Sequence, residues 1–288
     1  MEYRNPTVPP WLRILQWPLA RLVVLGGILF YMMMMAESNL ARFKSDPPLS
    51  IAAAIAMGLL ATAVYVGYGR LIERRTVSEL SLPGSVRECA AGALLGAGLY
   101  TACVLILMIL GVYRVDGLNA WTFLIPGIAM ALKAGIFEEL VFRGVLFRSV
   151  EDMFGSWISI VVSSLVFGLL HLFNPEGTIA GGVFISIEAG LLLAAAYLAT
   201  RRLWICFGFH AAWNYVQSAV YSGVVSGSVN EPGLIRDTIQ GPDLLTGGSF
   251  GMEQSVIALV LCTTAGIILL IIAARRGHIV PAPWKRQV

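Results

Sequence analysis

The chain has 288 residues, of which 57% are hydrophobic and only 13% are charged, and its mean hydropathy is +0.78. Ordinary soluble domains carry about 25% charged residues, so this composition excludes a soluble globular protein and leaves a polytopic membrane protein. The net charge of +3 gives no support to nucleic-acid binding, because in a membrane protein the distribution of Lys and Arg between loops matters more than their excess.

Eight segments are long and apolar enough to cross a bilayer as helices, which takes about 20 largely apolar residues. They cover approximately residues 18–36, 49–69, 90–113, 121 to the glutamate pair and beyond, 157–172, 178–200, 203–221 and 255–274. The expected fold class is therefore all-α, a polytopic membrane protein of about eight transmembrane helices. The glycines at 92, 96 and 98 of the third segment predict close helix packing.

The positive residues predict the orientation of these helices. If the amino terminus lies inside, fifteen Lys and Arg residues fall on the inner side and four on the outer side, with Lys133 inside a span. Short cytoplasmic loops retain an excess of positive residues, so both termini are expected on the cytoplasmic side. The expected location is a bacterial-type plasma membrane.

The same reading divides the chain into five parts. Trp11 and Trp17 are typical of an interfacial anchor, since indole rings prefer the headgroup level. The parts are an interfacial amino-terminal segment at 1–20, accessory transmembrane helices at 21–120, a core at 121–221 that contains the polar motifs described below, an outer loop at 222–254, and the last transmembrane helix with a basic tail at 255–288.

The run F-E-E-L-V-F-R-G at 137–144 places two carboxylates and a guanidinium in an apolar segment. An ionisable group inside a membrane span indicates a functional site by default. Glu139 and Arg143 are four residues apart and share a helix face, so they are expected to form a supporting ion pair. Glu138 points elsewhere and is the candidate general base; the alternative is a structural network with Lys133 or Arg143. Lys133 is expected to pair with Glu188 or to extend toward the interface.

A second polar group follows at the next helix, where Phe167 and His171 are four residues apart. Glu138 lies 17 residues before Gly155 and His171 lies 16 residues after it. If the chain turns at that glycine, an antiparallel hairpin brings Glu138 and His171 to nearly the same depth. This geometry requires the helix that carries Glu138 to continue to about residue 152.

A third pair, His210 and Asn214, also has the spacing of one helix face. About 10 Å of helix separates residue 203 from His210 at 1.5 Å per residue, a depth that suits a cavity open to the cytoplasm. A carboxylate and a histidine can activate a water for attack on an amide carbonyl. His210 and Asn214 could donate hydrogen bonds to the resulting oxyanion, so the residues predict amide hydrolysis in or beside the membrane.

Together these groups carry a family resemblance. E-E-x-x-x-R at 138–143, F-x-x-x-H at 167–171 and H-x-x-x-N at 210–214 resemble, in order, the three motifs of the CAAX-protease and bacteriocin-processing (CPBP, or Abi) intramembrane proteases. The resemblance covers residue 121 to about residue 220. It implies an eight-helix fold and endoproteolysis near the membrane surface. It also implies that Glu138 activates water with His171 and that His210 and Asn214 form the oxyanion site, with Phe167, Glu139 and Arg143 in support.

Several expectations about cofactors and partners follow. Glu138, His171 and His210 form a set that zinc would accept, but H-E-x-x-H is absent, and we favour a mechanism that requires no cofactor. The expected partners are the lipid bilayer and a peptide or protein substrate presented at the membrane, with prenylated and leader-bearing substrates as candidates. The competing interpretation is a non-catalytic scaffold, immunity protein or transporter whose buried polar cluster serves structure.

Overall fold

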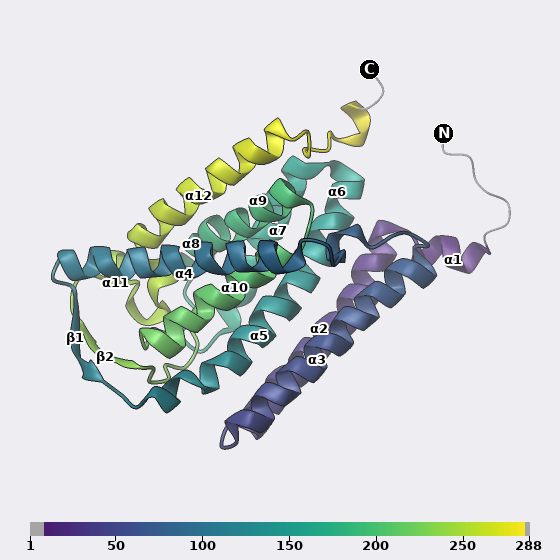
Figure 1. Ribbon diagram of the computed structural model, residues 1–288. Helices are drawn as coiled ribbons and strands as arrows, with labels where there is room; N and C mark the ends of the chain where they lie inside the picture. Colours follow the sequence, from purple (N-terminus) through teal and green to yellow (C-terminus); the bar gives the residue numbers. More distant parts are fainter. Residues whose placement is uncertain (1–8, 286–288) are drawn as a thin grey trace.

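The computed structural model describes residues 9–285 and shows a bundle of helices with a two-stranded ribbon at one end (Figure 1). Residues 1–8, which belong to the expected interfacial segment, and 286–288 lie outside this description. The first half contains α1 (Pro10–Leu15), α2 (Pro18–Arg42), α3 (Pro47–Gly67), the π-helical η1 (Tyr68–Ile72), the 3-10 turn η2 (Ser78–Leu80), α4 (Ser85–Ile109), β1 (Tyr113–Leu118), the 3-10 turn η3 (Trp121–Leu124), α5 (Pro126–Glu139), the π-helical η4 (Leu140–Phe147) and α6 (Arg148–Phe154).

Most of the second half is also helical. It contains α7 (Ser156–Leu170), the 3-10 turn η5 (His171–Phe173), α8 (Ile179–Ile185), the π-helical η6 (Ser186–Leu191), α9 (Leu192–Thr200), α10 (Trp204–Tyr215), the π-helical η7 (Val216–Val220), β2 (Ile235–Ile239), α11 (Asp243–Thr246), the 3-10 turns η8 (Gly248–Phe250) and η9 (Met252–Gln254), α12 (Val256–Arg275) and the 3-10 turn η10 (Pro283–Lys285). The all-α class is confirmed, with β1 and β2 as an antiparallel pair in which Tyr113 faces Ile239.

Within residues 9–285, six helices are long and apolar enough to cross a membrane, so the chain is an integral membrane protein. They are Pro18–Arg42, Pro47–Ile72, Ser85–Ile109, Ser156–Phe173, Ile179–Thr200 and Val256–Arg275. The fourth and seventh expected spans are helical too, but the former carries the charged motif and α10 has only 12 residues. The count of eight therefore stays a prediction, as does the cytoplasmic side of the termini.

The two described ends of the chain lie at the same end of the bundle, next to α1 and the last turn of α12 (Figure 1). The β1–β2 ribbon lies at the opposite end, together with the turn between α2 and α3. This arrangement is the one that an even number of crossings produces.

Helix α10 lies at the centre of the bundle, packed against α4 and α5. A Cβ built on Gly92 would lie 2.1 Å from the carbonyl oxygen of Ile205, and one on Gly96 would lie 2.4 Å from that of Phe209. The close packing expected at these two glycines is therefore confirmed. Gly98, in contrast, has nothing within 4 Å of its Cβ position, because it faces away from α10, and the prediction for this residue is wrong.

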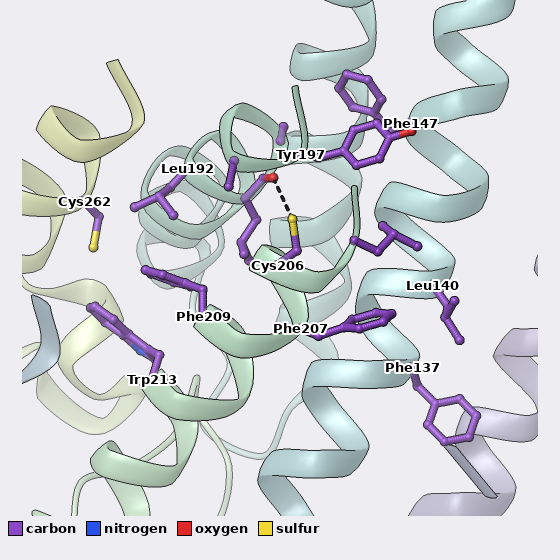
Figure 2. Close-up of a cluster of buried hydrophobic side chains, with 14 of the residues drawn as sticks. Phe137, Leu140, Phe147, Leu192, Tyr197, Cys206, Phe207, Phe209, Trp213 and Cys262 are labelled. Atoms are coloured by element: carbon purple, nitrogen blue, oxygen red, sulfur yellow. Dashed lines mark hydrogen bonds between the residues drawn. The ribbon is translucent and has the colours of Figure 1, made fainter. Parts of the chain in front are cut away.

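A cluster of aromatic, aliphatic and cysteine side chains surrounds α10 (Figure 2). Cys206 is fully buried there and its thiol contacts the carbonyl of Leu193 at 3.5 Å. The side chain of Phe207 points from α10 toward α5, and that of Phe209 points toward α12, so α10 is packed on both sides (Figure 2). This core fixes the helix that carries His210 and Asn214.

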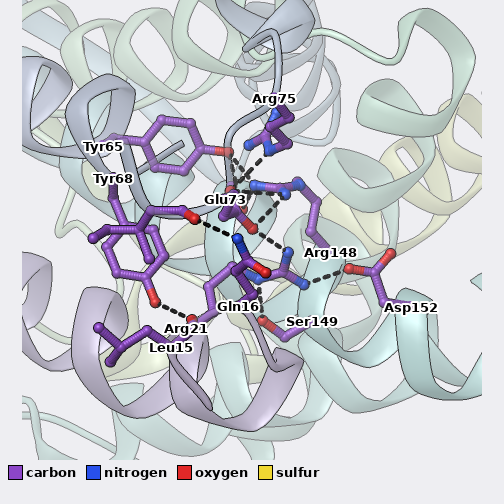
Figure 3. Close-up of polar contacts among 12 residues, drawn as sticks. Leu15, Gln16, Arg21, Tyr65, Tyr68, Glu73, Arg75, Arg148, Ser149 and Asp152 are labelled. Carbon is purple, nitrogen blue, oxygen red and sulfur yellow. Dashed lines mark hydrogen bonds and ion pairs between the residues drawn. The ribbon is translucent and has the colours of Figure 1, made fainter. Parts of the chain in front are cut away.

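An ion-pair network joins the α2–α3 hairpin to α6 (Figure 3). Arg21 contacts Glu73 at 2.7 Å and Asp152 at 2.6 Å, and Arg148 contacts Glu73 at 3.2 Å. Burial alone would raise the pKa of the Glu73 carboxyl, but the guanidinium groups of Arg148, Arg21 and Arg75 outweigh it and lower that pKa to about 2. The network therefore keeps its charges and fixes the amino-terminal hairpin against the helix that carries the first motif.

Candidate active site

The first motif lies where α5 continues into the π-helical segment η4. Gly135, one turn before the motif, lets α5 approach α10 closely: a Cβ at this position would lie 2.8 Å from the Cβ of Ala211. Ala211 directly follows His210, so this contact brings the two polar motifs to the same level. Helix α5 ends at Glu139, and the eight-residue π-helical segment η4 begins at the next residue.

Glu139 and Arg143 form the expected ion pair, with 2.9 Å between Oε1 and Nη1. Both side chains are essentially inaccessible to solvent, at 0% and 1% exposed. The same Glu139 oxygen lies 2.8 Å from Nδ1 of His210, a contact that the spacing of residues did not predict. Glu139 therefore connects the first motif to the third.

Glu138 lies off the Glu139–Arg143 pair, as its position on the helix predicted. Its side chain is 16% exposed, and Oε2 lies 3.8 Å from Nε2 of His210. In the described part of the chain, Glu138 accepts no hydrogen bond from a side chain. A carboxylate that is close to an imidazole and still has free lone pairs can accept a proton from water.

The hairpin that carries the first two motifs is confirmed. The helix of Glu138 runs without a break through η4 and α6 to Phe154, and Gly155 turns the chain with a φ of 82°. Phe142, four residues after Glu138, packs edge-to-face on Phe167 with 4.9 Å between the ring centroids. Phe167 precedes His171 by four residues, so Glu138 and His171 extend from neighbouring levels of the two helices.

The proton on the His171 ring can be placed from its hydrogen bond. Nδ1 lies 2.7 Å from the carbonyl oxygen of Phe167, and a carbonyl can only accept. Nδ1 therefore carries the hydrogen in neutral His171, and Nε2 keeps a lone pair that can hold a water molecule.

The ring of Phe167 lies between the three motifs. Its centroid is 4.7 Å from that of His171 and 6.1 Å from that of His210, and the Arg143 guanidinium carbon lies 4.9 Å from it. Phe167 is 1% exposed. The side chain expected to support the site therefore separates and orients its two imidazoles.

Asn214 lies one turn beyond His210 on α10 and is 6% exposed. Both residues line a cavity of about 20 Å³, together with Phe167, Glu188, Ser226 and Glu253. A cavity needs about 10–15 Å³ to hold a water molecule. Asn214 and His210 therefore face a cavity that is large enough for one water molecule.

The expected pairing of Lys133 with Glu188 is wrong. Lys133 contacts Glu37 of α2 at 2.5 Å, because α5 packs against α2 on the side away from the cavity. Glu188 instead lines that cavity. The side chains of Lys133 and Glu188 therefore have different surroundings and do not pair.

Glu253 is a site residue that the sequence analysis missed. It lies at the end of the outer loop, and its carboxylate accepts hydrogen bonds from Trp213 at 3.4 Å, Gln217 at 2.6 Å and the Ser226 hydroxyl at 3.1 Å. Burial raises the pKa of Glu253, although the donors of Gln217 and Ser226 lower it in part. A single acid just before an apolar segment was the available signal in the sequence.

The residues named for zinc are Glu138, His171 and His210. The Nδ1 atoms of His171 and His210 bond to Phe167 and Glu139, which leaves Nε2 of each ring as the nitrogen that could bind a metal. Within residues 9–285, no group of three His, Cys, Asp or Glu side chains is placed so that it could hold a metal ion. We therefore derive no step through zinc, and the independence from cofactors stays a prediction.

The part of the chain that carries the three motifs matches a known protein family. Residues 120–216 match the family model described as Type II CAAX prenyl endopeptidase Rce1-like. No curated protein and no solved structure matches the chain. The matched stretch contains all three motifs, from Glu138 to Asn214. The family resemblance of the motifs is therefore confirmed: over residues 120–216 this chain matches the Rce1-like family of Type II CAAX prenyl endopeptidases.

Proposed function

We propose that this protein is an intramembrane endopeptidase that hydrolyses a peptide bond with a water activated by Glu138 and His171. The contact between Glu139 and His210 carries the proposal, because it draws the first and third motifs into one site. The family match supports CAAX-type protease activity in general. The roles of individual residues rest on the geometry described above.

The first chemical step is attack on the substrate carbonyl. A water held by the lone pair of His171 Nε2 gives a proton to Glu138 while its oxygen bonds to the carbonyl carbon. The C=O electrons move onto the oxygen, which becomes an oxyanion. General-base assistance of this kind contributes about 10²- to 10⁴-fold in rate.

The oxyanion needs hydrogen-bond donors, and His210 and Asn214 are the candidates. Because Nδ1–H of His210 is directed at Glu139, Nε2 can donate only when the ring is doubly protonated. The carboxylates of Glu138 and Glu139 lie on either side of the ring and stabilise that cation. Asn214 contributes the second donor through its NH₂ group.

Collapse of the intermediate completes the reaction. The carbonyl re-forms, the C–N bond breaks, and the proton held by Glu138 passes to the leaving amine. Arg143 neutralises Glu139 throughout, so that Glu139 fixes the imidazole without competing as a base. No step requires a further reactant.

The substrate proposed is a peptide presented to a cavity open to the cytoplasm, in a bacterial-type plasma membrane. A prenylated carboxyl-terminal peptide and a leader peptide are the two candidates. A survey of protein termini should identify it: cells with the wild-type chain should contain new termini that are missing from cells with Glu138→Gln. Identical sets of termini would favour the alternative of a non-catalytic scaffold, immunity protein or transporter.

A further inference from the structure

Glu188 is a buried acid that the proposed mechanism does not use. The residue is 1% exposed, and neither carboxyl oxygen has a hydrogen-bond partner in the described part of the chain. It lines the same cavity as His210 and Asn214. Buried polar groups almost always have a partner, which can be an ordered water molecule.

The backbone around Glu188 is fixed to the site. Arg143 donates hydrogen bonds from Nη2 to the carbonyl oxygens of Ala189 and Gly190, each at 3.2 Å. A Cβ on Gly190 would lie 2.8 Å from Cα of Ser164, so the π-helical segment η6 rests directly on α7. The guanidinium that pairs with Glu139 therefore also holds the segment that carries Glu188.

The surroundings of Glu188 favour the neutral acid. In the part of the chain that the structure describes, no Lys or Arg side chain forms an ion pair with it, and the walls of the cavity include Ile185, Leu193 and Phe209. An isolated ionised carboxylate in such a setting costs so much free energy that the group takes up a proton instead. The carboxyl of Glu253 on the same cavity disfavours a second negative charge. A neutral carboxylic acid has one O–H donor.

Asn214 needs such a donor. To stabilise an oxyanion, its carboxamide must turn the NH₂ group toward the substrate, which leaves Oδ1 directed into the protein. Among the residues that the structure describes, none donates to that oxygen, and the oxygen and nitrogen of an amide exchange places on a simple flip. A donor on the cavity side would select the productive orientation.

We infer that Glu188 is a positioning residue that fixes the amide of Asn214: its O–H donates, through one water in the shared cavity, to Oδ1 and so directs the NH₂ group at the oxyanion. This inference rests on the proposed function. The cavity volume of about 20 Å³ fits a bridging water, and Ser226 supplies a further polar wall.

Three variants test the inference in the purified full-length chain. Glu188→Leu fills a similar volume but removes the donor, and should lower kcat about tenfold, the effect of one hydrogen bond, with KM unchanged. Glu188→Gln keeps an N–H donor and should retain most of the activity. In an Asn214→Ala background, Glu188→Leu should cause no further loss, because the amide it positions is missing.

Infrared difference spectroscopy gives a readout that does not depend on cleavage. The spectrum of the wild type minus Glu188→Gln at neutral pH should contain the C=O band of a protonated carboxylic acid, and a carboxylate band in its place would overturn the inference. An equal loss from Glu188→Leu with and without Asn214 would also overturn it. If the wild type cleaves nothing, the proposed function fails, whereas the infrared band still decides the state of Glu188.

Discussion

Nδ1 of His210 lies 2.8 Å from Oε1 of Glu139, the same oxygen that pairs with Arg143. One buried carboxylate thus neutralises a guanidinium and orients an imidazole. The neighbouring Glu138 has neither task. Replacement by Gln should consequently lower the stability of the protein at position 139 and the rate of cleavage at position 138.

Glu139→Gln should destabilise the protein, because it leaves Arg143 without its counter-ion at 1% exposure. Breaking a buried pair from one side costs about 3–5 kcal/mol. The midpoint of unfolding in detergent should fall clearly for Glu139→Gln and stay unchanged for Glu138→Gln. Equal midpoints for the two variants would contradict the division of roles.

Two glycines of α4 should differ in their tolerance of a methyl group. Gly96→Ala places a Cβ 2.4 Å from the Phe209 carbonyl oxygen and should destabilise by about 1–3 kcal/mol, the usual cost of overpacking. Gly98→Ala meets nothing and should be neutral or slightly stabilising, because alanine favours a helix. Denaturant midpoints of the two variants check this, and equal losses would mean that α4 and α10 do not pack as described.

Residue spacing in the sequence correctly predicted those features of the structure that depend only on helix periodicity and on the number of residues between two positions. The i, i+4 pair of Glu139 and Arg143 and the hairpin about Gly155 follow from helix periodicity and from counting residues along one continuous stretch. The all-α class follows from the apolar segments. The hairpin involves only two consecutive helices, and none of these inferences depends on which helices from distant parts of the chain lie beside them.

The contacts that sequence reasoning missed depend on which helices lie side by side. His210 reaches Glu139 because Gly135 lets α5 approach α10, and Lys133 finds Glu37 because α2 lies on the opposite side of α5. Glu253 reaches Trp213 only after the outer loop folds back over the bundle. The same composition would permit other neighbours, so periodicity could not select these.

The free energy of unfolding should change with pH because of Asp237 in β2. Burial and the nearby Asp116 raise the pKa of Asp237 from 3.8 to about 6. The folded state therefore binds this proton more tightly than the unfolded state, and the associated stability is lost as pH rises from about 4 through 6. Asp237→Asn should be more stable than the wild type at pH 8, by on the order of 1 kcal/mol after solvent screening, and equal to it near pH 4.

Unfolding midpoints across this pH range make the comparison. Asp243→Asn, in the exposed part of the same loop, is the matched control for the chemical change from Asp to Asn. A gain for Asp237→Asn that is the same at pH 4 and pH 8 would contradict the assignment.

Removal of metal ions should leave cleavage intact. No three-ligand group of His, Cys, Asp or Glu side chains exists among the described residues. The rate should therefore be the same before and after treatment with a strong zinc chelator, and elemental analysis should find no stoichiometric metal. Loss of activity that added zinc restores would show that the site rearranges to bind it.

The central claim is that Glu138 is the base for peptide hydrolysis, and the rate of cleavage of a reporter peptide by purified protein tests it most directly. Once a substrate has been identified from the survey of termini, wild type and Glu138→Gln should be compared at equal folded concentration. The account predicts a fall in kcat of about 10²- to 10⁴-fold with an unchanged unfolding midpoint. Cleavage by Glu138→Gln at the wild-type rate would contradict it.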